Sequence, residues 1–249
     1  AVLKLLSDAG IAARASDRPS WPLVLAGGPV AFLNPFPVMP ALDGLFVGEA
    51  EAGLEGVAEA VARSWIAGGG KDEALEAIAS REGVLVPGRS AEPVRRAVAG
   101  ASSVLGSPAY SCFVSSEAQF RDMLLLEVNR GCPYGCRFCA AGSIYKPPRH
   151  AEMGVLQEIV ERCEPHKVGL VGTALTDWPD LLPFLQWLAE RKVKFSLSSL
   201  RADGLSDELL GFLRHTGTRS VTLALEGASR RLRRAMNKHF SEDAFLEAV

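Results

Sequence analysis

The second half of the chain alternates short apolar runs with amphipathic stretches. Each run is short enough to be a buried strand, and the stretches between the runs place apolar side chains at helical spacing. The runs that we expect to be strands are residues 123–126, 167–171, 194–200 and 220–225. The expected helices are residues 152–163, 181–191, 207–215 (capped by Ser206), 232–238 and 242–249. Strand followed by helix, repeated, predicts an α/β fold with a parallel sheet and right-handed crossovers.

The first half shows a similar but shorter alternation. Apolar runs at residues 22–26 and 45–47 each stop at a glycine, which predicts two short buried strands. Helical periodicity predicts helices at residues 1–13, 50–67 and 71–81, with an extended piece at 83–88. This order is typical of the last part of a doubly wound α/β unit. The pattern weakens from residue 89 to about residue 122, where we expect a surface connector.

Composition narrows the class of protein. The 249 residues are 48% hydrophobic and 22% charged, with a net charge of -2, as in ordinary globular proteins. Nothing in this balance indicates a nucleic acid or an anionic membrane as partner. We find no apolar run that could span a bilayer and no signal peptide. The chain lacks an initiator Met, so we expect a cut or processed N-terminus, and the chemistry below favours the cytoplasm.

Three cysteines stand close together after the first strand of the second half. Cys132, Cys136 and Cys139 are separated by three and then two residues, on a loop bent by Pro133 and Gly135. Soft thiolates of this kind suit an iron–sulfur cluster or zinc. Three of them would hold three irons of a [4Fe–4S] cluster and leave the fourth iron without a protein ligand. An open iron suggests a cluster that binds a substrate or cofactor.

Other interpretations of the cysteines stay open. A structural zinc site needs a fourth ligand, for which Cys163 or His150 is available outside any finger or ribbon spacing. An electron-carrying cluster of the ferredoxin type would need a fourth cysteine close by. The three thiols could also be unligated. Cys112 is expected, like Cys163, to be a small and partly buried side chain rather than half of a disulfide.

The segment CPYGCRFC resembles the CxxxCxφC signature of the radical S-adenosylmethionine (SAM) enzymes, with Phe138 as the aromatic residue. The resemblance implies a [4Fe–4S] cluster on Cys132, Cys136 and Cys139 whose open iron is chelated by the amino and carboxylate groups of SAM. It also implies reductive cleavage of SAM to methionine and a 5′-deoxyadenosyl radical, with Phe138 near the adenine. An external electron donor of the flavodoxin or ferredoxin type is implied as partner, and the fold as a partial (β/α)6 barrel.

Ligands of parallel barrels lie at the carboxyl ends of strands, which nominates further residues. After the second strand, Gly172 and Asp177 are the closest equivalents of the family's GGE-type motif for the SAM amino group, and the match is imperfect. Asp177 could equally cap the helix that follows Pro179. After the third strand, Ser198 and Arg201 stand where a planar guanidinium could pair with the SAM carboxylate. The alternative for Arg201 is an ordinary surface contact with Asp203.

After the fourth strand, Glu226 and Ser229 lie in a segment that resembles the ESGS-type segment of related enzymes, where the glutamate binds the SAM ribose. An ionised carboxylate accepts two hydroxyl donors. A basic run follows, in which related sequences commonly read S-x-x-LR-x-x-x-NK. Without interleaved aromatic residues we expect a solvated helix face rather than an RNA contact. The run comprises Arg230, Arg231, Arg233, Arg234 and Lys238.

Residues 23–51 resemble the end of the Rossmann-like domain of B12-binding radical SAM proteins, with a GGP turn, an NP turn and a strand that ends in GE. In cobalamin binders the paired glycine approaches the cofactor, although Gly27 and Gly28 could simply turn the chain. The usual D-x-H-x-x-G ligand motif is missing, since no His precedes His150. Cobalamin is therefore a doubtful cofactor. We expect three parts: residues 1–67 from the Rossmann-like domain, a connector at 68–122, and a truncated barrel at 123–249.

These patterns predict a fragment of a radical SAM enzyme that acts on an unidentified substrate. One alternative is a non-catalytic iron–sulfur protein that transfers electrons or senses redox state. Another is a cobalamin-dependent methyltransferase or a methylthiotransferase-like enzyme that modifies RNA. The last of these needs a second cluster in the front domain, and the sequence has no cysteines there for it.

Overall fold

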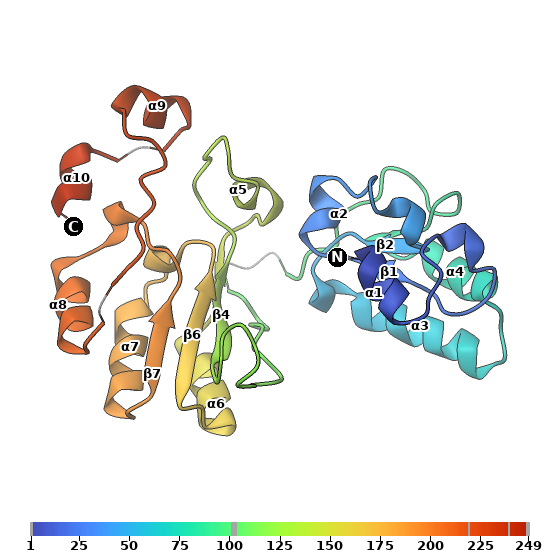
Figure 1. Cartoon of the computed structure of the whole chain (residues 1–249), viewed down its shortest axis with the longest axis horizontal. Helices are drawn as coiled ribbons and strands as arrows, with labels where there is room; N and C mark the ends of the chain where they lie inside the picture. Colours follow the sequence, from blue (N-terminus) through green and yellow to red (C-terminus); the bar gives the residue numbers. More distant parts are fainter. Residues whose placement is uncertain (1, 101–103, 219, 239, 248–249) are drawn as a thin grey trace. The chain divides into compact units, whose positions relative to one another are not determined.

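The chain folds into two compact units, Ala1–Ala101 and Ser102–Val249. The computed structural model describes residues 2–100, 104–218, 220–238 and 240–247 (Figure 1). The sequence predicted a separate connector at residues 68–122. In the structure the first part of that segment belongs to the first unit and its last part to the second, because both parts pair with the sheets of their own unit.

The first unit is built on a small sheet in the order β1-β2-β3. β1 (Leu25–Ala26) and β2 (Gly44–Phe46) are parallel, and β3 (Val84–Leu85) runs antiparallel to β2. The helices of this unit are α1 (Val2–Asp8), α2 (Pro29–Leu33), α3 (Leu54–Ile66) and α4 (Lys71–Ala79), with 3₁₀ segments η1 (Ala15–Asp17), η2 (Met39–Ala41) and η3 (Ala50–Ala52). The helix expected at residues 1–13 is thus shorter, ending at Asp8 before the positive-φ Gly10.

Helices α3 and α4 pack together and cover the sheet with their apolar faces. Val57 of α3 and Ile78 of α4 are buried in one core with Phe46 and Val84 of the strands. Gly68 separates the two helices with a φ of 77°, a left-handed conformation that glycine adopts without steric cost. The triple glycine therefore ends α3 where the sequence predicted.

A group of charged side chains is buried beside this core. Asp43 accepts an ion pair from Lys71 Nζ at 2.7 Å and another from Arg18 Nη2 at 3.2 Å. Its carboxylate also accepts the backbone N–H of Val24 at 2.7 Å. Arg18 donates further to the Ala41 carbonyl, and Lys71 to the carbonyl of Arg18. The group therefore ties the start of α4 to the chain on either side of β1.

The second unit holds the main sheet, in the order β5-β4-β6-β7 (Figure 1). β4 (Leu124–Arg130), β6 (Lys167–Gly172) and β7 (Lys194–Leu197) are parallel, as the sequence predicted. β5 (Arg149–His150) is an antiparallel addition at the edge of β4. The helices are α5 (Ala141–Ile144), α6 (Met153–Cys163), α7 (Leu181–Glu190), α8 (Asp207–His215), α9 (Arg230–Ala235) and α10 (Glu242–Glu247), with η4 (Leu175–Asp177) and η5 (Ala202–Gly204).

Two local expectations are wrong, and part of a third falls outside the described residues. The strand expected at residues 220–225 is not formed in its described part, where a single bridge pairs Leu223 with Leu200. The neighbouring strand β7 already ends at Leu197, so its edge is too short for further pairing. Pro147 and Pro148 also predicted an extended segment over residues 143–149, but Ser143 and Ile144 form the end of α5, since a proline restricts only itself and the residue before it. The predicted helix at 242–249 is seen to Glu247, and residues 248–249 lie outside the described part.

The core of the second unit is formed by the central strands and the helices that cover them. Leu126 of β4 and Val168 of β6 are fully buried against Leu156 of α6 and Phe184 of α7. Because β4, β6 and β7 are parallel, the loops that follow them lie at the same end of the sheet, where Figure 1 also shows α5 and α9. None of the helices within the described ranges is long and apolar enough to cross a bilayer.

Candidate metal and cofactor site

The three cysteines follow β4 on a loop whose backbone accepts only glycine at its first position. Gly131 has a φ of 91°, and a Cβ there would collide with the carbonyl oxygen of Tyr145. The loop tightens further where the Cys139 N–H donates to the Cys136 carbonyl at 3.1 Å. A Cβ at Gly142 would run into the Tyr134 carbonyl at 2.5 Å. These close backbone contacts hold the loop in a compact conformation.

The thiols are free and accessible. Cys132 and Cys136 are half-buried, and Cys139 is exposed. Burial raises the pKa of the Cys132 thiol, and the nearby Asp177 carboxylate and Cys136 raise it further, while a backbone hydrogen bond at Tyr134 and the Arg201 guanidinium oppose the shift. A bound metal would displace this proton, because thiolates rather than thiols are metal ligands.

By chemistry and number this donor set fits an iron–sulfur cluster better than a closed zinc site. It offers three soft donors, none used in a disulfide and none in the hydrophobic core. In the part of the chain that the structure describes, no three or more His, Cys, Asp or Glu side chains are already gathered around one point. Cys163 offers no fourth ligand, because it ends α6 just before β6, which is parallel to β4, and so lies at the opposite end of the sheet from the loop after β4.

Tyr134, inside the cysteine loop, brings the loops after the three strands together. Its hydroxyl donates to Asp177 Oδ1 at 3.0 Å. The guanidinium carbon of Arg201 lies 3.5 Å from the centre of its ring, which is a close cation–π contact. Burial and the hydrogen bond to Asp177 raise the pKa of Tyr134, so the phenol stays a donor. The structure therefore places Asp177 and Arg201, both nominated from the sequence, next to the cysteine loop.

Arg201 is also held by a carboxylate. Its Nη2 donates to Asp203 Oδ2 at 2.6 Å; Arg201 is partly buried and Asp203 is an exposed residue. Burial lowers the pKa of Arg201, but Asp203, Tyr134 and Asp177 outweigh this and raise it overall. The Arg201–Asp203 contact foreseen as an alternative thus exists, yet its arginine faces the cysteine loop. Arg201 is a fixed cation at the carboxyl end of β7.

Asn129 joins the ends of β4 and β6. Its Oδ1 accepts the backbone N–H groups of Thr173 and Ala174, and its Nδ2 donates to the Ala174 carbonyl at 2.6 Å. A Cβ at Gly172 would collide with the Asn129 side chain, so β6 can approach β4 this closely only with glycine at that position. Gly131 N–H in turn donates to Thr173 Oγ1 at 3.1 Å. The loop that carries Asp177 is therefore fastened to the strand that carries the cysteines.

The segment around α9 reaches the cysteine loop from another direction. The Arg137 N–H donates to the Met236 carbonyl at 2.9 Å, and its guanidinium donates to the Ala235 carbonyl at 2.6 Å. Asn237 Nδ2 donates to the Gly135 carbonyl at 2.9 Å. The end of α9 thus acts as a backing for the loop, on the side of the loop that holds its second and third cysteines.

Comparison with known proteins agrees with this geometry. Residues 126–249 match the family model described as the radical SAM superfamily, and residues 1–87 match that of radical SAM proteins, N-terminal. The chain belongs to the radical SAM superfamily. It is also 30% identical over 234 residues, 91% of its length, to an uncharacterized protein of Methanocaldococcus jannaschii, MJ0966. The chain spans about half of that relative, 48% of its length.

The family assignment supports the partial α/β barrel, and it supports iron–sulfur and SAM binding in general terms. The match over residues 1–87 is to the N-terminal region of radical SAM proteins, so the B12-binding subclass and the role of Gly27 and Gly28 stay predictions. In the structure Gly28 has a φ of 77° and precedes α2. That conformation explains a glycine there without any cofactor.

The remaining nominated residues of this radical SAM chain are less tightly placed. Phe138 is exposed at the loop surface, and Ser198 is exposed after β7. Asp177 does not cap α7, because the residue at that position is Asp180. Glu226, at a φ of 64°, pairs with Lys238 Nζ at 3.4 Å. Ser229 caps α9 by accepting the Leu232 N–H at 3.2 Å, a structural role that leaves its SAM contact a prediction.

The basic run departs from the solvated helix face expected of it. Arg230, Arg231 and Arg234 are exposed, but Arg233 and Lys238 are buried. Arg233 is held inward by hydrogen bonds to the Gly227 and Ala228 carbonyls, and Lys238 by one to the Ala224 carbonyl. The two other cysteines also differ from expectation, since both Cys112 and Cys163 are exposed. Sequence reasoning missed Asn129 and Tyr134, although a polar residue ending an apolar strand and a Tyr between two of the three cysteines were visible signals.

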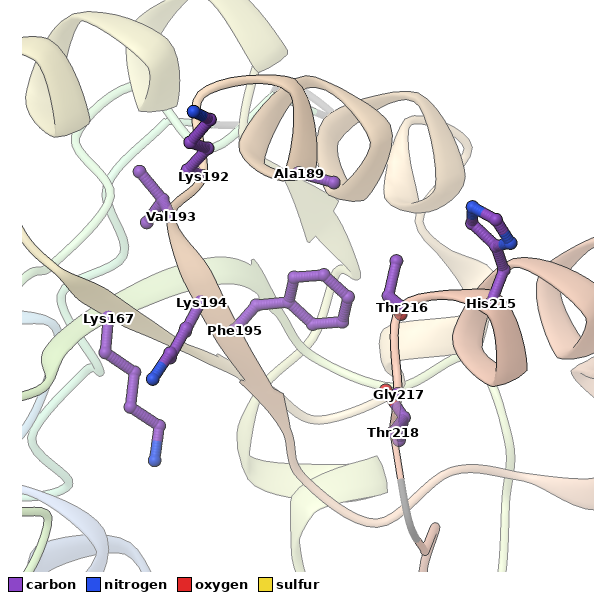
Figure 2. Close-up of a pocket in the computed structure, with 10 residues that line it drawn as sticks. All are labelled: Lys167, Ala189, Lys192, Val193, Lys194, Phe195, His215, Thr216, Gly217 and Thr218. Carbon is purple, nitrogen blue, oxygen red and sulfur yellow. The ribbon is translucent and has the colours of Figure 1, made fainter.

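A separate cavity of about 620 Å³ lies away from the cysteine loop (Figure 2). It opens at the amino ends of β6 and β7, where Lys167 and Lys194 face each other in register. Figure 2 shows Phe195 reaching across it toward Thr216, at the end of α8. Its lysines are partly or fully exposed, so water already solvates them. It is no part of the site built from the carboxyl ends of the strands.

Proposed function

We propose that this chain is the catalytic part of a radical SAM enzyme, with a [4Fe–4S] cluster held by Cys132, Cys136 and Cys139. The observation that supports it most is the convergence of three loops through Tyr134. Asp177 and Arg201, from two different strand ends, both contact this one side chain beside the cysteines. Packing of the loop alone does not require a carboxylate and a guanidinium at that point. The amino acid part of SAM, which carries an ammonium and a carboxylate group, requires both.

The loaded cluster would supply one electron to split SAM into methionine and a 5′-deoxyadenosyl radical. The chain's own residues would bind and orient SAM. Asp177 Oδ2 is buried without a hydrogen-bond partner among the described residues, so it is an acceptor for the SAM ammonium group. Arg201 would hold the carboxylate, and Glu226 the ribose hydroxyls. Phe138, Gly172, Ser198 and Ser229 belong to the proposed site by family resemblance only.

The partners follow from the chemistry. The electron would come from an external donor of the flavodoxin or ferredoxin type, and the radical would abstract hydrogen from a substrate that the present chain does not identify. Because the chain spans 48% of its relative, residues outside it can contribute to substrate choice. A cobalamin-dependent reaction has no residue-level support beyond the Gly27–Gly28 turn.

The first test is anaerobic SAM cleavage by the reconstituted chain with dithionite, reading 5′-deoxyadenosine. We expect the wild type and Cys163→Ala, which removes an exposed cysteine outside the site, to form it, and Cys136→Ala to lose both cluster absorbance and product. Asp177→Asn should keep the cluster and raise the KM for SAM about tenfold, as expected for loss of one charged hydrogen bond.

An electron-carrying protein would behave differently in the same experiment. Its cluster would assemble, but SAM would neither alter the EPR spectrum of the reduced cluster nor be cleaved. Cluster assembly in Cys136→Ala would contradict the assignment of the ligands themselves. Equal SAM cleavage by Asp177→Asn and the wild type at low SAM would contradict the proposed contact with the ammonium group.

A further inference from the structure

A small cavity of about 270 Å³ lies against α9 and is lined mainly by cations. Its lining residues are Arg230, Arg233, Arg234, Lys238, Phe240 and Ser241. We infer that this cavity is an oxyanion site that binds the phosphate group of a small phosphorylated molecule. The inference rests on the proposed function only in making that molecule the substrate; the binding itself is independent of it.

Arg233 is a buried cation in the wall of this cavity with donors that remain unused. Its side chain is 2% exposed, and its Nη1 donates to the carbonyls of Gly227 and Ala228 at 2.9 and 2.8 Å. Its Nε and Nη2 are buried with no hydrogen-bond partner in the described ranges. A buried guanidinium with two idle donors is costly unless an acceptor fills their positions. The two idle donors can bind two oxygens of one oxyanion side by side.

Within the described part of the chain, no carboxylate compensates the charge of Arg233. Among the described residues Arg230, Arg233 and Arg234 form no ion pair, and Lys238 has only Glu226 at 3.4 Å. Phe240 offers its ring to both Arg233 and Lys238, at 5.5 and 5.6 Å, but a ring face replaces an anion only in part. The whole chain has a net charge of -2, so this concentration of cations is local.

The charge and size of the cavity indicate the class of ligand. Four cations against one carboxylate exceed what a single carboxylate ligand needs and suit a phosphate, which carries up to two negative charges. About 270 Å³ is below the usual range for whole drug-sized ligands, so the cavity holds a head group. A single aromatic ring is too little for the stacked bases of RNA.

The position of the cavity relates it to the cysteine loop. The residues just after α9, Met236 and Asn237, contact the loop through Arg137 and Gly135. Lys238 follows them directly and lines the cavity. A phosphate bound there would therefore anchor one end of a molecule beside the loop that holds the cluster ligands.

The test is binding of inorganic pyrophosphate to the full chain by isothermal titration calorimetry, without SAM or reductant. Arg234→Gln removes an exposed cation that lines the cavity, and Arg231→Gln removes an exposed cation of the same helix that does not. We expect Arg234→Gln and Arg230→Gln each to weaken binding at least about tenfold, and Arg231→Gln less than about twofold. Arg233→Lys should also weaken it, because lysine lacks the fork.

Several results would overturn the inference. They are undetectable pyrophosphate binding at millimolar concentration, equal losses in Arg231→Gln and Arg234→Gln, and acetate that binds as tightly as pyrophosphate. Single-stranded RNA that binds tightly, with Arg231→Gln as harmful as Arg234→Gln, would instead identify a nucleic-acid surface. Since the titration contains neither SAM nor reductant, its failure leaves the SAM-cleavage experiment unaffected, and failure of SAM cleavage leaves the titration unaffected.

Discussion

Both units of this radical SAM chain bury cations, and the pair Arg18 and Lys71 of the first unit is compensated differently from the pair Arg233 and Lys238 of the second. In the first unit Arg18 and Lys71 both reach the carboxylate of Asp43, itself 7% exposed. Among the described residues of the second unit, Arg233 has no carboxylate partner, and Lys238 reaches Glu226, whose side chain is 36% exposed, only at 3.4 Å. The cations of the two pairs are buried to a similar degree, but only those of the first unit have a buried carboxylate that balances their charge.

The difference separates structural charge from charge that is available to a ligand. The Asp43 group needs nothing from outside, because backbone carbonyls accept the remaining donors on both cations apart from Arg18 Nε. The Arg233 guanidinium lacks a counter-charge among the described residues until an anion binds. Burial alone, which both groups share, therefore does not indicate function, whereas a buried cation with two idle donors and no counter-charge does.

The largest effect is expected from Asp43→Asn. The change leaves Arg18 and Lys71 buried without a counter-charge, so the free energy of unfolding of the first unit should fall by about 3–5 kcal/mol. Denaturant-dependent hydrogen exchange followed on the peptide that contains α4 measures this unit separately from the second. The matched control is Asp8→Asn, which breaks an exposed pair with Lys4 and should cost less than about 0.5 kcal/mol. Equal effects of both changes would refute the structural role of Asp43.

Asn129→Ala tests a neutral buried group that is fully satisfied. It would leave the N–H groups of Thr173 and Ala174 without their acceptor, and we expect a loss of about 2–4 kcal/mol in the second unit. Hydrogen exchange should increase first at residues 172–178. Thr173→Val is the lesser change, removing one hydrogen bond to Gly131, and should cost about 1 kcal/mol. A loss below 1 kcal/mol for Asn129→Ala would mean that the two strand ends are held together by packing alone.

Arg233→Met should cost the second unit only about 1–2 kcal/mol, because two lost hydrogen bonds are offset by removal of an uncompensated buried charge. Phosphate should raise the midpoint of thermal unfolding of the wild type, as any ligand of the folded state does, and should not raise that of the variant. A loss as large as that of Asp43→Asn would place Arg233 among the structural charges and would remove the contrast between the two units.

The smallest effect concerns Cys132 in the metal-free chain. Burial raises its pKa, so alkylation by iodoacetamide should have its midpoint above the ordinary thiol value, by an amount that Asp177→Asn reduces and Arg201→Gln increases. The folded chain holds the Cys132 proton more tightly than the unfolded chain does. The contribution of this thiol to the free energy of unfolding is therefore full at pH values below its unfolded pKa and is lost as the pH rises through its folded pKa. Midpoints that both variants leave unchanged would contradict the proximity of the three side chains.

The sequence predicted the parts of the fold that depend on local pattern. Helices α6 and α7 and strands β4 and β6 lie within a residue or a few of their predicted bounds, because buried faces repeat at fixed spacing. β5 was not foreseen, since two residues carry no periodicity. The strand at 220–225 was predicted from apolar residues, but hydrogen-bonded pairing requires a neighbouring edge that a sequence pattern cannot supply.

The candidate site was predictable where residue type decides and not where contacts decide. Cysteine spacing nominated Cys132, Cys136 and Cys139, and strand ends nominated Asp177 and Arg201. That a tyrosine would lie between the last two depends on how the loops meet in space. The burial of Arg233 was equally hidden, because an arginine-rich helix reads as solvated until its neighbours are known.

The edge of β4 carries one further consequence. Residues 104–111 run along it: Ala109 and Ser111 bond Glu127 and Leu125, and Leu105 N–H donates to the His150 carbonyl of β5. This cover shields an edge that would otherwise recruit strands from other molecules. A polypeptide begun at residue 123, where the apolar run starts, would keep Cys132, Cys136 and Cys139 and yet be prone to aggregate. The excisable second unit must instead begin ahead of residue 104.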